Sequence, residues 1–135
     1  MKEITLEARV ENIERVTAFV DEALEELGCS MRSQMQIDVA IDEIFGNIAR
    51  YAYAPAGGPA TVQMDFDPAA GMVSLTFRDQ GIPYNPETKE DPDTTLPAEE
   101  RAIGGLGIFL VKKTMDAMTY HREGDSNVLV IRKKI

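Results

Sequence analysis

The stretch DEIFGNIARY, residues 42–51, lies near the end of a long run with helical periodicity. At about 100° per residue, Glu43, Asn47 and Arg50 fall on one narrow stripe of that helix. The apolar residues fall on a separate stripe that should face the core: Ile37, Ile41, Ile44, Ile48 and Ala52. On periodicity alone, the polar stripe is an ordinary solvated face. Gly46 beside it is unusual, because a mid-helix glycine costs about 1 kcal/mol relative to alanine and lets another group approach the backbone.

Strands and helices are predicted on both sides of this run. The run begins at Ser30 and ends near Tyr53, and an earlier helix is expected between an N-cap at Asn12 and Gly28. A last helix is expected over 108–115. Strands are predicted over 4–10, 60–66, 72–77, 117–122 and 128–135. The order βααββ–loop–αββ predicts one α+β domain over 1–135, a two-layer sandwich whose mixed, mostly antiparallel sheet carries its helices on one face.

Composition excludes several kinds of site. The chain has 135 residues, a net charge of −9 and 44% hydrophobic residues, which is typical of a globular protein. The acidic balance argues against direct nucleic-acid binding, because phosphate contacts need a basic surface. Cys29 and His121 are single, which excludes an intramolecular disulfide and argues against a histidine-rich zinc site or a Ser-His-Asp triad. No run approaches about 18 apolar residues and the start shows no apolar leader, so we expect a cytoplasmic protein without membrane contact.

Two glycine-containing segments flank a long loop. The predicted strand over 72–77 runs on into Asp79-Gln80-Gly81, and residues 80–103 hold four prolines, scattered acids and no sustained period. Such a loop in a compact domain is usually either a functional lid or a disordered segment. Residues 104–107, GGLG, open the last helix, where free N–H groups and the helix dipole favour an anion. Their spacing fits neither the Rossmann nor the P-loop pattern. Taken singly, neither segment requires a ligand. Residues 79–81 are equally well explained as a turn at the end of a strand, and residues 104–107 as a glycine hinge at the end of the loop.

Taken together, the segments are far more specific. Their order resembles the Bergerat-fold ATP-binding domain of the GHKL superfamily of gyrase, Hsp90, histidine kinases and MutL. Residues 47–51 resemble its N box, residues 79–81 its first glycine box and residues 105–107 its second. Within the superfamily, the short chain, the stretch DQGIPYNP (79–86) and the stretch GGLGIFLVKKTMD (104–116) are most similar to the small anti-sigma factor serine kinases. The resemblance covers almost the whole chain.

The resemblance implies a role for each matching residue of the long helix and the first glycine box. Asn47 would hold Mg²⁺ against the ATP phosphates, and Arg50 would contact phosphate. Glu43 would be the general base. Asp79 would accept a hydrogen bond from the adenine amino group, and Gly81 would make room for the ring.

The resemblance implies further contacts from the lid, about residues 87–103, and from the helix that follows it. Gly105 and Gly107, with Leu106 between them, would offer N–H groups to the phosphates, and Arg101 would be a lid contact to phosphate. Asn127 stands where relatives often have Thr, and it receives no assignment.

The implied activity is transfer of the ATP γ-phosphoryl group to a serine or threonine of a protein. The resemblance names a STAS-domain anti-anti-sigma protein as the substrate and a sigma factor as the second partner. It also allows a homodimer through the N-terminal strand and first helix. Two alternatives stay open: a nucleotide-binding switch without catalysis, and a histidine-kinase-like ATPase module.

Overall fold

The computed structural model describes residues 1–53, 56–84 and 105–135. Five strands and three α-helices make up this part of the chain. Their order is β1 (Lys2–Glu7), α1 (Ile13–Glu26), α2 (Met31–Asn47), β2 (Pro59–Asp67), β3 (Met72–Asp79), α3 (Gly105–Thr114), β4 (Ala117–Glu123) and β5 (Ser126–Lys134). Two short helical turns, Val10–Asn12 and Ile48–Ala52, precede α1 and extend α2.

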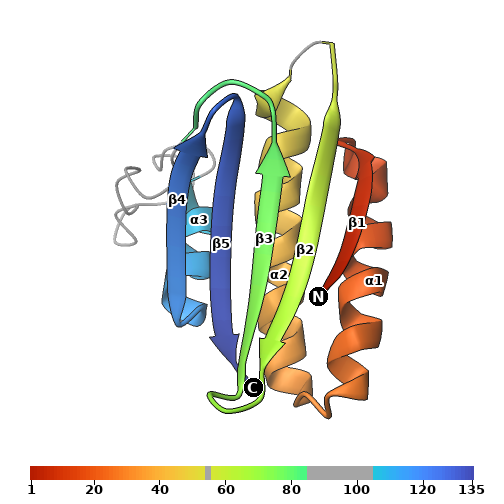
Figure 1. The fold of residues 1–135 in the computed structure, drawn as a ribbon, viewed down its shortest axis with the longest axis vertical. Helices are drawn as coiled ribbons and strands as arrows, with labels where there is room; N and C mark the ends of the chain where they lie inside the picture. The colour runs from red at the N-terminus through yellow and green to blue at the C-terminus, as the bar shows by residue number, and fades with distance from the viewer. Residues whose placement is uncertain (54–55, 85–104) are drawn as a thin grey trace.

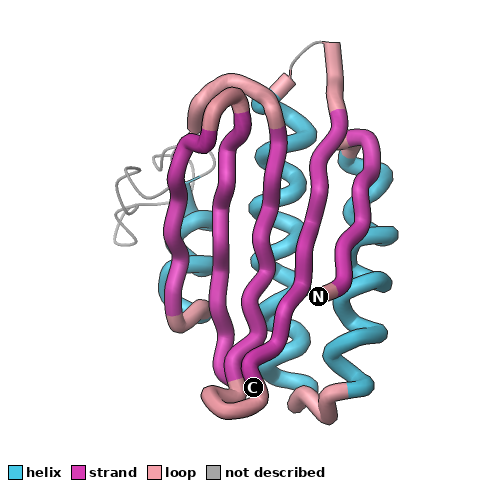
Figure 2. Tube along the Cα trace, in the orientation of Figure 1, coloured by secondary structure: helices cyan, strands magenta, loops and turns pink. Residues whose placement is uncertain are grey.

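The strands form one sheet, and the helices lie together on one of its faces (Figures 1 and 2). The strand order is β1-β2-β3-β5-β4. This confirms the predicted two-layer α+β fold. All four described pairings are antiparallel, whereas the sequence predicted a mixed sheet. Even β3 and β5 are antiparallel neighbours, although the long loop and α3 separate them in the chain.

The predicted apolar stripe of α2 faces the core. Ile37, Ile41 and Ile44 are at most 2% exposed, and they pack in one cluster with residues from both layers, among them Phe45 and Phe77. Burying side chains of this size provides most of the free energy that holds helix to sheet. None of the helices in the described ranges is long and apolar enough to cross a membrane.

The helix ends agree with the sequence in part. Ser30 caps α2 by accepting a hydrogen bond from the Ser33 N–H at 3.2 Å. Gly28 follows α1 with a φ of +72°, a conformation that glycine adopts without strain. Asn12 is not the predicted side-chain cap, because its amide donates instead to the Glu7 carbonyl at 2.8 Å. The predicted continuation of α2 toward Tyr53 is a π-helical turn.

Two carboxyl groups meet between α1 and α2. Asp38 is hydrogen-bonded to the side chain of Asp21, and among the described residues the Oδ1 atom of each is buried without a partner. Burial, the hydrogen bond and the repulsion from Asp21 raise the pKa of Asp38 to about 7. The folded protein therefore holds a proton here over a range of pH in which an unfolded aspartate has lost it.

This pair predicts that the protein loses stability as the pH rises toward 8. Because the folded pKa is the raised one, the contribution is complete below about pH 3.9 and is lost as the pH rises through about 7. The substitution Asp38→Asn supplies a permanent donor to Asp21. It should raise the free energy of unfolding at pH 8 and change it little at pH 5, measured by urea denaturation. Asp42→Asn, on the exposed side of the same helix, is the control and should keep the wild-type pH dependence. An Asp38→Asn protein with the wild-type pH dependence would show that the two carboxyls do not share a proton.

Candidate functional site

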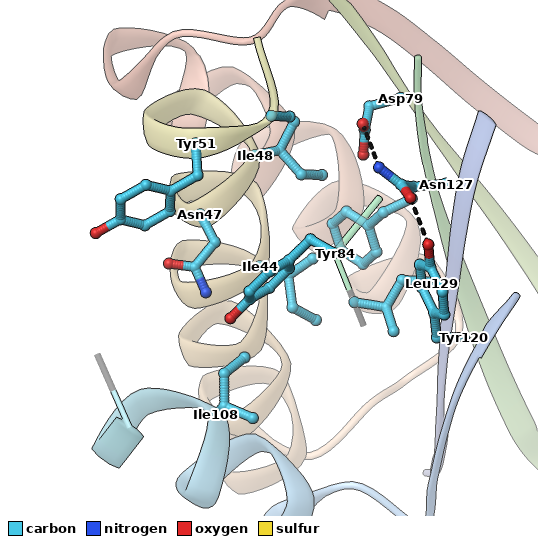
Figure 3. A pocket seen from close by; sticks show the side chains of 12 residues that line it. Ile44, Asn47, Ile48, Tyr51, Asp79, Tyr84, Ile108, Tyr120, Asn127 and Leu129 are labelled. Carbon is cyan, nitrogen blue, oxygen red and sulfur yellow. Dashed lines mark hydrogen bonds between the residues drawn. The ribbon is translucent and has the colours of Figure 1, made fainter. Parts of the chain in front are cut away.

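A cavity of about 40 Å³ lies between the C-terminal half of α2 and the sheet (Figure 3). Most of its wall is apolar, with amides and a carboxylate at its two ends. Its lining consists of Ile44, Asn47, Ile48, Tyr51, Ala52, Phe77, Asp79, Tyr84, Ile108, Tyr120, Asn127 and Leu129. This volume holds a few water molecules, so a ligand the size of a nucleobase would require the walls to move apart. Tyr51 and Tyr84 are the exposed aromatic walls, and they are the side chains with room to move.

Asp79 forms the sheet end of the cavity. It is the last residue of β3, it is 6% exposed, and its Oδ1 atom accepts hydrogen bonds from the Gly81 N–H and the Asn127 amide, both at 2.9 Å. Both donors use the same oxygen. Oδ2 therefore remains to accept a hydrogen bond from a ligand in the cavity.

Asn127 fixes that orientation, and sequence reasoning missed it. Its amide also donates to the Ile82 carbonyl at 2.7 Å, and its Oδ1 atom accepts from the Tyr120 hydroxyl at 2.5 Å and from Arg122 at 3.1 Å. Figure 3 shows the row from Asp79 through Asn127 to Tyr120. Both amide hydrogens and both acceptor positions are thus used, which leaves Asn127 as a support for Asp79. The one sequence signal was its position close to the start of the last strand, where the resemblance implies Thr.

Gly81 packs closely against the end of the long helix. A Cβ atom at this position would collide with the carbonyl group and the side chain of Ala52, at the end of the long helix. The space that the missing side chain spares is filled by Ala52. The role that the resemblance implies for Gly81, making room for the adenine ring, stays a prediction. The same contact lets the Ile82 N–H donate to the Ala52 carbonyl at 2.9 Å.

Glu43 and Asn47 meet at the other end of the cavity, one helical turn apart. The Asn47 amide donates to Glu43 Oε1 at 3.3 Å. Its amide oxygen accepts no hydrogen bond from the described part of the chain, so it remains for a ligand. The Glu43 carboxylate lies against Gly107 in the first turn of α3, so closely that a Cβ on Gly107 would overlap it. Two residues of the predicted stripe, Glu43 and Asn47, are therefore joined by a hydrogen bond, and Asn47 lines the cavity.

Arg50 is the residue whose side chain lies over the mid-helix glycine. Its guanidinium lies over Gly46, where a Cβ would be 2.8 Å from Nη1.

Gly105 and Leu106 form the start of α3 with Gly107. Arg101 and the predicted lid, about residues 87–103, lie outside the described residues. Among the described residues, no group of three or more His, Cys, Asp or Glu side chains could hold a metal ion.

The sequence pattern of the histidine kinase-like ATPase domain matches residues 6–133. The chain belongs to that family. This confirms the resemblance to the GHKL superfamily, and ATP is the nucleotide that the family implies.

Two kinases are among the relatives of this histidine kinase-like ATPase domain. It is 28% identical over 102 residues to the serine/threonine-protein kinase BtrW of Bordetella bronchiseptica, covering 76% of this chain and 71% of BtrW. It is 24% identical over 89 residues to the serine-protein kinase RsbW of Staphylococcus aureus, covering 63% of this chain and 56% of RsbW. The resemblance to the anti-sigma factor serine kinases is thus a distant homology.

The fold itself matches that of a histidine kinase, AdeS of Acinetobacter baumannii. The TM-score is 0.51 at 13% identity, over 99% of this chain and 68% of that one. At this identity the match concerns the fold alone.

The network around Asn127 predicts a loss of stability when that side chain is shortened. The substitution Asn127→Ala leaves the Ile82 carbonyl without its donor and the Tyr120 hydroxyl without its acceptor. We expect it to lower the free energy of unfolding by about 1–3 kcal/mol, measured by urea denaturation. Tyr120→Phe removes one bond of the same network and should cost less. Equal stability of Asn127→Ala and the wild type would contradict the network.

Proposed function

We propose that this ATPase domain is a Mg²⁺-ATP-dependent protein serine/threonine kinase of the anti-sigma type. In this proposal Asp79 Oδ2 accepts a hydrogen bond from the adenine amino group. Asn47 and Arg50 contact the metal and the phosphates, and Glu43 is the general base. Gly105, Leu106 and Gly107 offer backbone N–H groups to the phosphates, and Arg101 is a further phosphate contact from the lid.

One observation carries the proposal: a single mostly apolar cavity has Asp79 at one end and Asn47 at the other, with Glu43 bonded to Asn47. Apolar walls suit the faces of a purine, while one fixed acceptor suits its exocyclic amino group. A carboxylate one helical turn from the proposed metal ligand is placed to take a proton where the phosphates would end. The curated relatives, both protein kinases, support the same activity.

The residues present fit Mg²⁺ held mainly by a nucleotide. Mg²⁺ prefers oxygen ligands, keeps several waters and is commonly bound by one or two protein groups together with substrate phosphates. The free amide oxygen of Asn47 is such a ligand, and the absence of an acidic cluster among the described residues agrees with a site that the protein alone does not complete. When bound, the ion would neutralise charge on the phosphates.

The transfer step asks the protein for positioning and for one proton acceptor. The Glu43 carboxylate takes the proton of the substrate hydroxyl. The freed oxygen forms a bond to the γ-phosphorus, and the bond from that phosphorus to the bridging oxygen breaks, so that ADP leaves. Arg50 offers a positive charge to the phosphates. Asp79 holds the adenine ring at the far end of the cavity.

The partners follow from the resemblance alone. The substrate would be a STAS-domain anti-anti-sigma protein and the second partner a sigma factor, with a homodimer as the state of the kinase. A net charge of −9 suits a basic partner surface.

The substitution Glu43→Gln should separate catalysis from binding. It keeps the size of the side chain and an oxygen for the Asn47 amide, but it removes the proton acceptor. We expect near-normal ATP affinity by calorimetry and phosphorylation of the STAS-domain substrate slowed by about 10²–10⁴-fold. Asn47→Ala should instead lower both Mg²⁺-ATP affinity and transfer. Glu25→Gln, exposed on α1, is the control and should behave as wild type. A wild-type rate in Glu43→Gln would show that Glu43 is not the base, and the switch without catalysis would then explain the site.

The substitution Asp79→Asn should weaken ATP binding at least tenfold. Because the Gly81 N–H and the Asn127 amide both require an acceptor at the Oδ1 position, the new NH₂ group must take the position that faces the cavity. There it meets the adenine amino group, donor against donor, and the hydrogen bond to a charged acceptor is lost, at a cost of about 1.5–3 kcal/mol. Calorimetry with ATP measures the loss, and Asp125→Asn in the β4–β5 turn is the control. Unchanged affinity in a folded Asp79→Asn protein would remove Asp79 from the adenine site.

A further inference from the structure

A groove of about 550 Å³ runs between α2 and α3 on the helical side of the molecule. Four of the exposed large apolar side chains line it: Met31 (71% exposed), Met35 (60%), Val39 (50%) and Leu110 (42%). Met31, Met35 and Val39 follow one another at every fourth residue of α2 and so form a continuous stripe. Apolar side chains gathered in this way on a surface mark a site for a partner more often than single exposed ones do.

The groove ends at the proposed general base. Glu43 lies one turn beyond Val39 on α2 and against Gly107, which lies one turn before Leu110 on α3. The two helices therefore run antiparallel side by side, with Glu43 and Gly107 at one end of the groove and Met31 and Thr114 at the other (Figure 1). At a rise of 1.5 Å per residue, Val39 lies about 6 Å, Met35 about 12 Å and Met31 about 18 Å from Glu43 along the helix.

The far end of the groove carries one basic lining residue, although the chain as a whole is acidic. Arg32 lines the groove beside Met31. Lys113 is exposed on α3 next to Thr114, outside the lining residues, and its ammonium group lies 5.3 Å from the centre of the Phe109 ring. Glu43 and the exposed Asp42 lie at the near end. The charge thus changes sign along the groove, which gives a bound segment a preferred direction.

We infer that this groove binds the segment of the substrate protein that carries the acceptor hydroxyl, an inference that rests on the proposed kinase activity. The segment is an amphipathic helix. Its hydroxyl lies at Glu43, its apolar side chains lie one and two turns away against Val39, Met35 and Leu110, and an acidic residue lies beyond them near Arg32 and Lys113. Packing a helix into the groove between two others and anchoring it by residues four apart is a common mode of recognition. A second copy of this chain is the competing occupant, because an antiparallel twofold arrangement would also place the acidic end of one groove on the basic end of the other.

The inference can be tested with a synthetic peptide and the full chain. The probe is a helix-stapled peptide with a serine near its start. Leucines stand four and eight positions after the serine, and glutamates stand eleven and twelve positions after it. Its binding is followed by fluorescence polarisation and by the methyl resonances of ¹³C-methionine-labelled protein, with ATP and Mg²⁺ present. The variants are Val39→Glu and Met35→Glu in the groove. The matched control is Val10→Glu, where a valine of similar exposure (44%) lies outside the groove.

We expect the peptide to shift the Met31 and Met35 resonances and to leave those of the core residues Met64 and Met115 in place. Val39→Glu and Met35→Glu should weaken binding at least tenfold, and Val10→Glu should leave it unchanged. Replacing the glutamates of the peptide by lysine should weaken binding several-fold, and Arg32→Glu should restore it. ATP affinity should be the same in all variants.

Four outcomes would overturn the docking site. The first is no movement of the Met31 and Met35 resonances at millimolar peptide, and the second is weakening of binding by Val10→Glu as large as that by Val39→Glu. The third is phosphorylation of the peptide by the Val39→Glu protein as fast as by wild type. The fourth is conversion of a wild-type dimer to a monomer by Val39→Glu, which would make a second copy the occupant. Failure of the kinase proposal looks different. The peptide would then bind in the groove with ATP present, with the expected effect of Val39→Glu, and would not be phosphorylated.

Discussion

The site depends on how the turn after β3 is held against the end of the long helix. The Ile82 N–H donates to the Ala52 carbonyl, and Gly81 packs so closely on Ala52 that no side chain would fit between them. The Tyr53 hydroxyl adds a second tie, since it accepts from the Gln80 N–H at 2.6 Å and donates to the Pro59 carbonyl at 2.6 Å. These contacts join the helix that carries Asn47 to the strand that carries Asp79. The distance across the cavity is therefore set by backbone contacts, which move less than side chains do.

With one end of α2 fixed in this way, each face of the helix contacts a different part of the molecule. The isoleucine stripe packs on the sheet, and Asn47 borders the cavity. The stripe from Met31 to Val39 stays exposed beside α3. Glu43 lies where the cavity and the exposed groove approach each other, since it is bonded to Asn47 and lies against Gly107. A base in that place can face a nucleotide on one side and a protein hydroxyl on the other, which is what transfer between the two requires.

Sequence patterns predicted the features that depend on local periodicity and on single residues. The isoleucine stripe, the Ser30 cap and Gly28 after α1 belong to this class. Asn127 could not be predicted, because its pairing with Asp79 depends on the register of β3 and β5, two strands brought together across the long loop. The role of Gly81 depends in the same way on a close approach to Ala52 from a distant part of the chain.

The position of Glu43 also bears on why the proposed activity would need a cation. Its carboxylate packs against Gly107 in the first turn of α3, where the helix dipole is positive and stabilises a negative charge. The resemblance assigns phosphate contacts to the same turn. A carboxylate and a polyphosphate a few ångströms apart repel each other by several kcal/mol where water is partly excluded, which half a unit of positive charge at a helix end does not offset. A divalent cation would offset that repulsion, and Asn47, whose amide N–H donates to Glu43, is the residue proposed to hold it. In the proposed function Asn47 and Glu43 would therefore act as a unit, because the Asn47 amide would hold the ion that allows the Glu43 carboxylate and the phosphates to lie at one helix end.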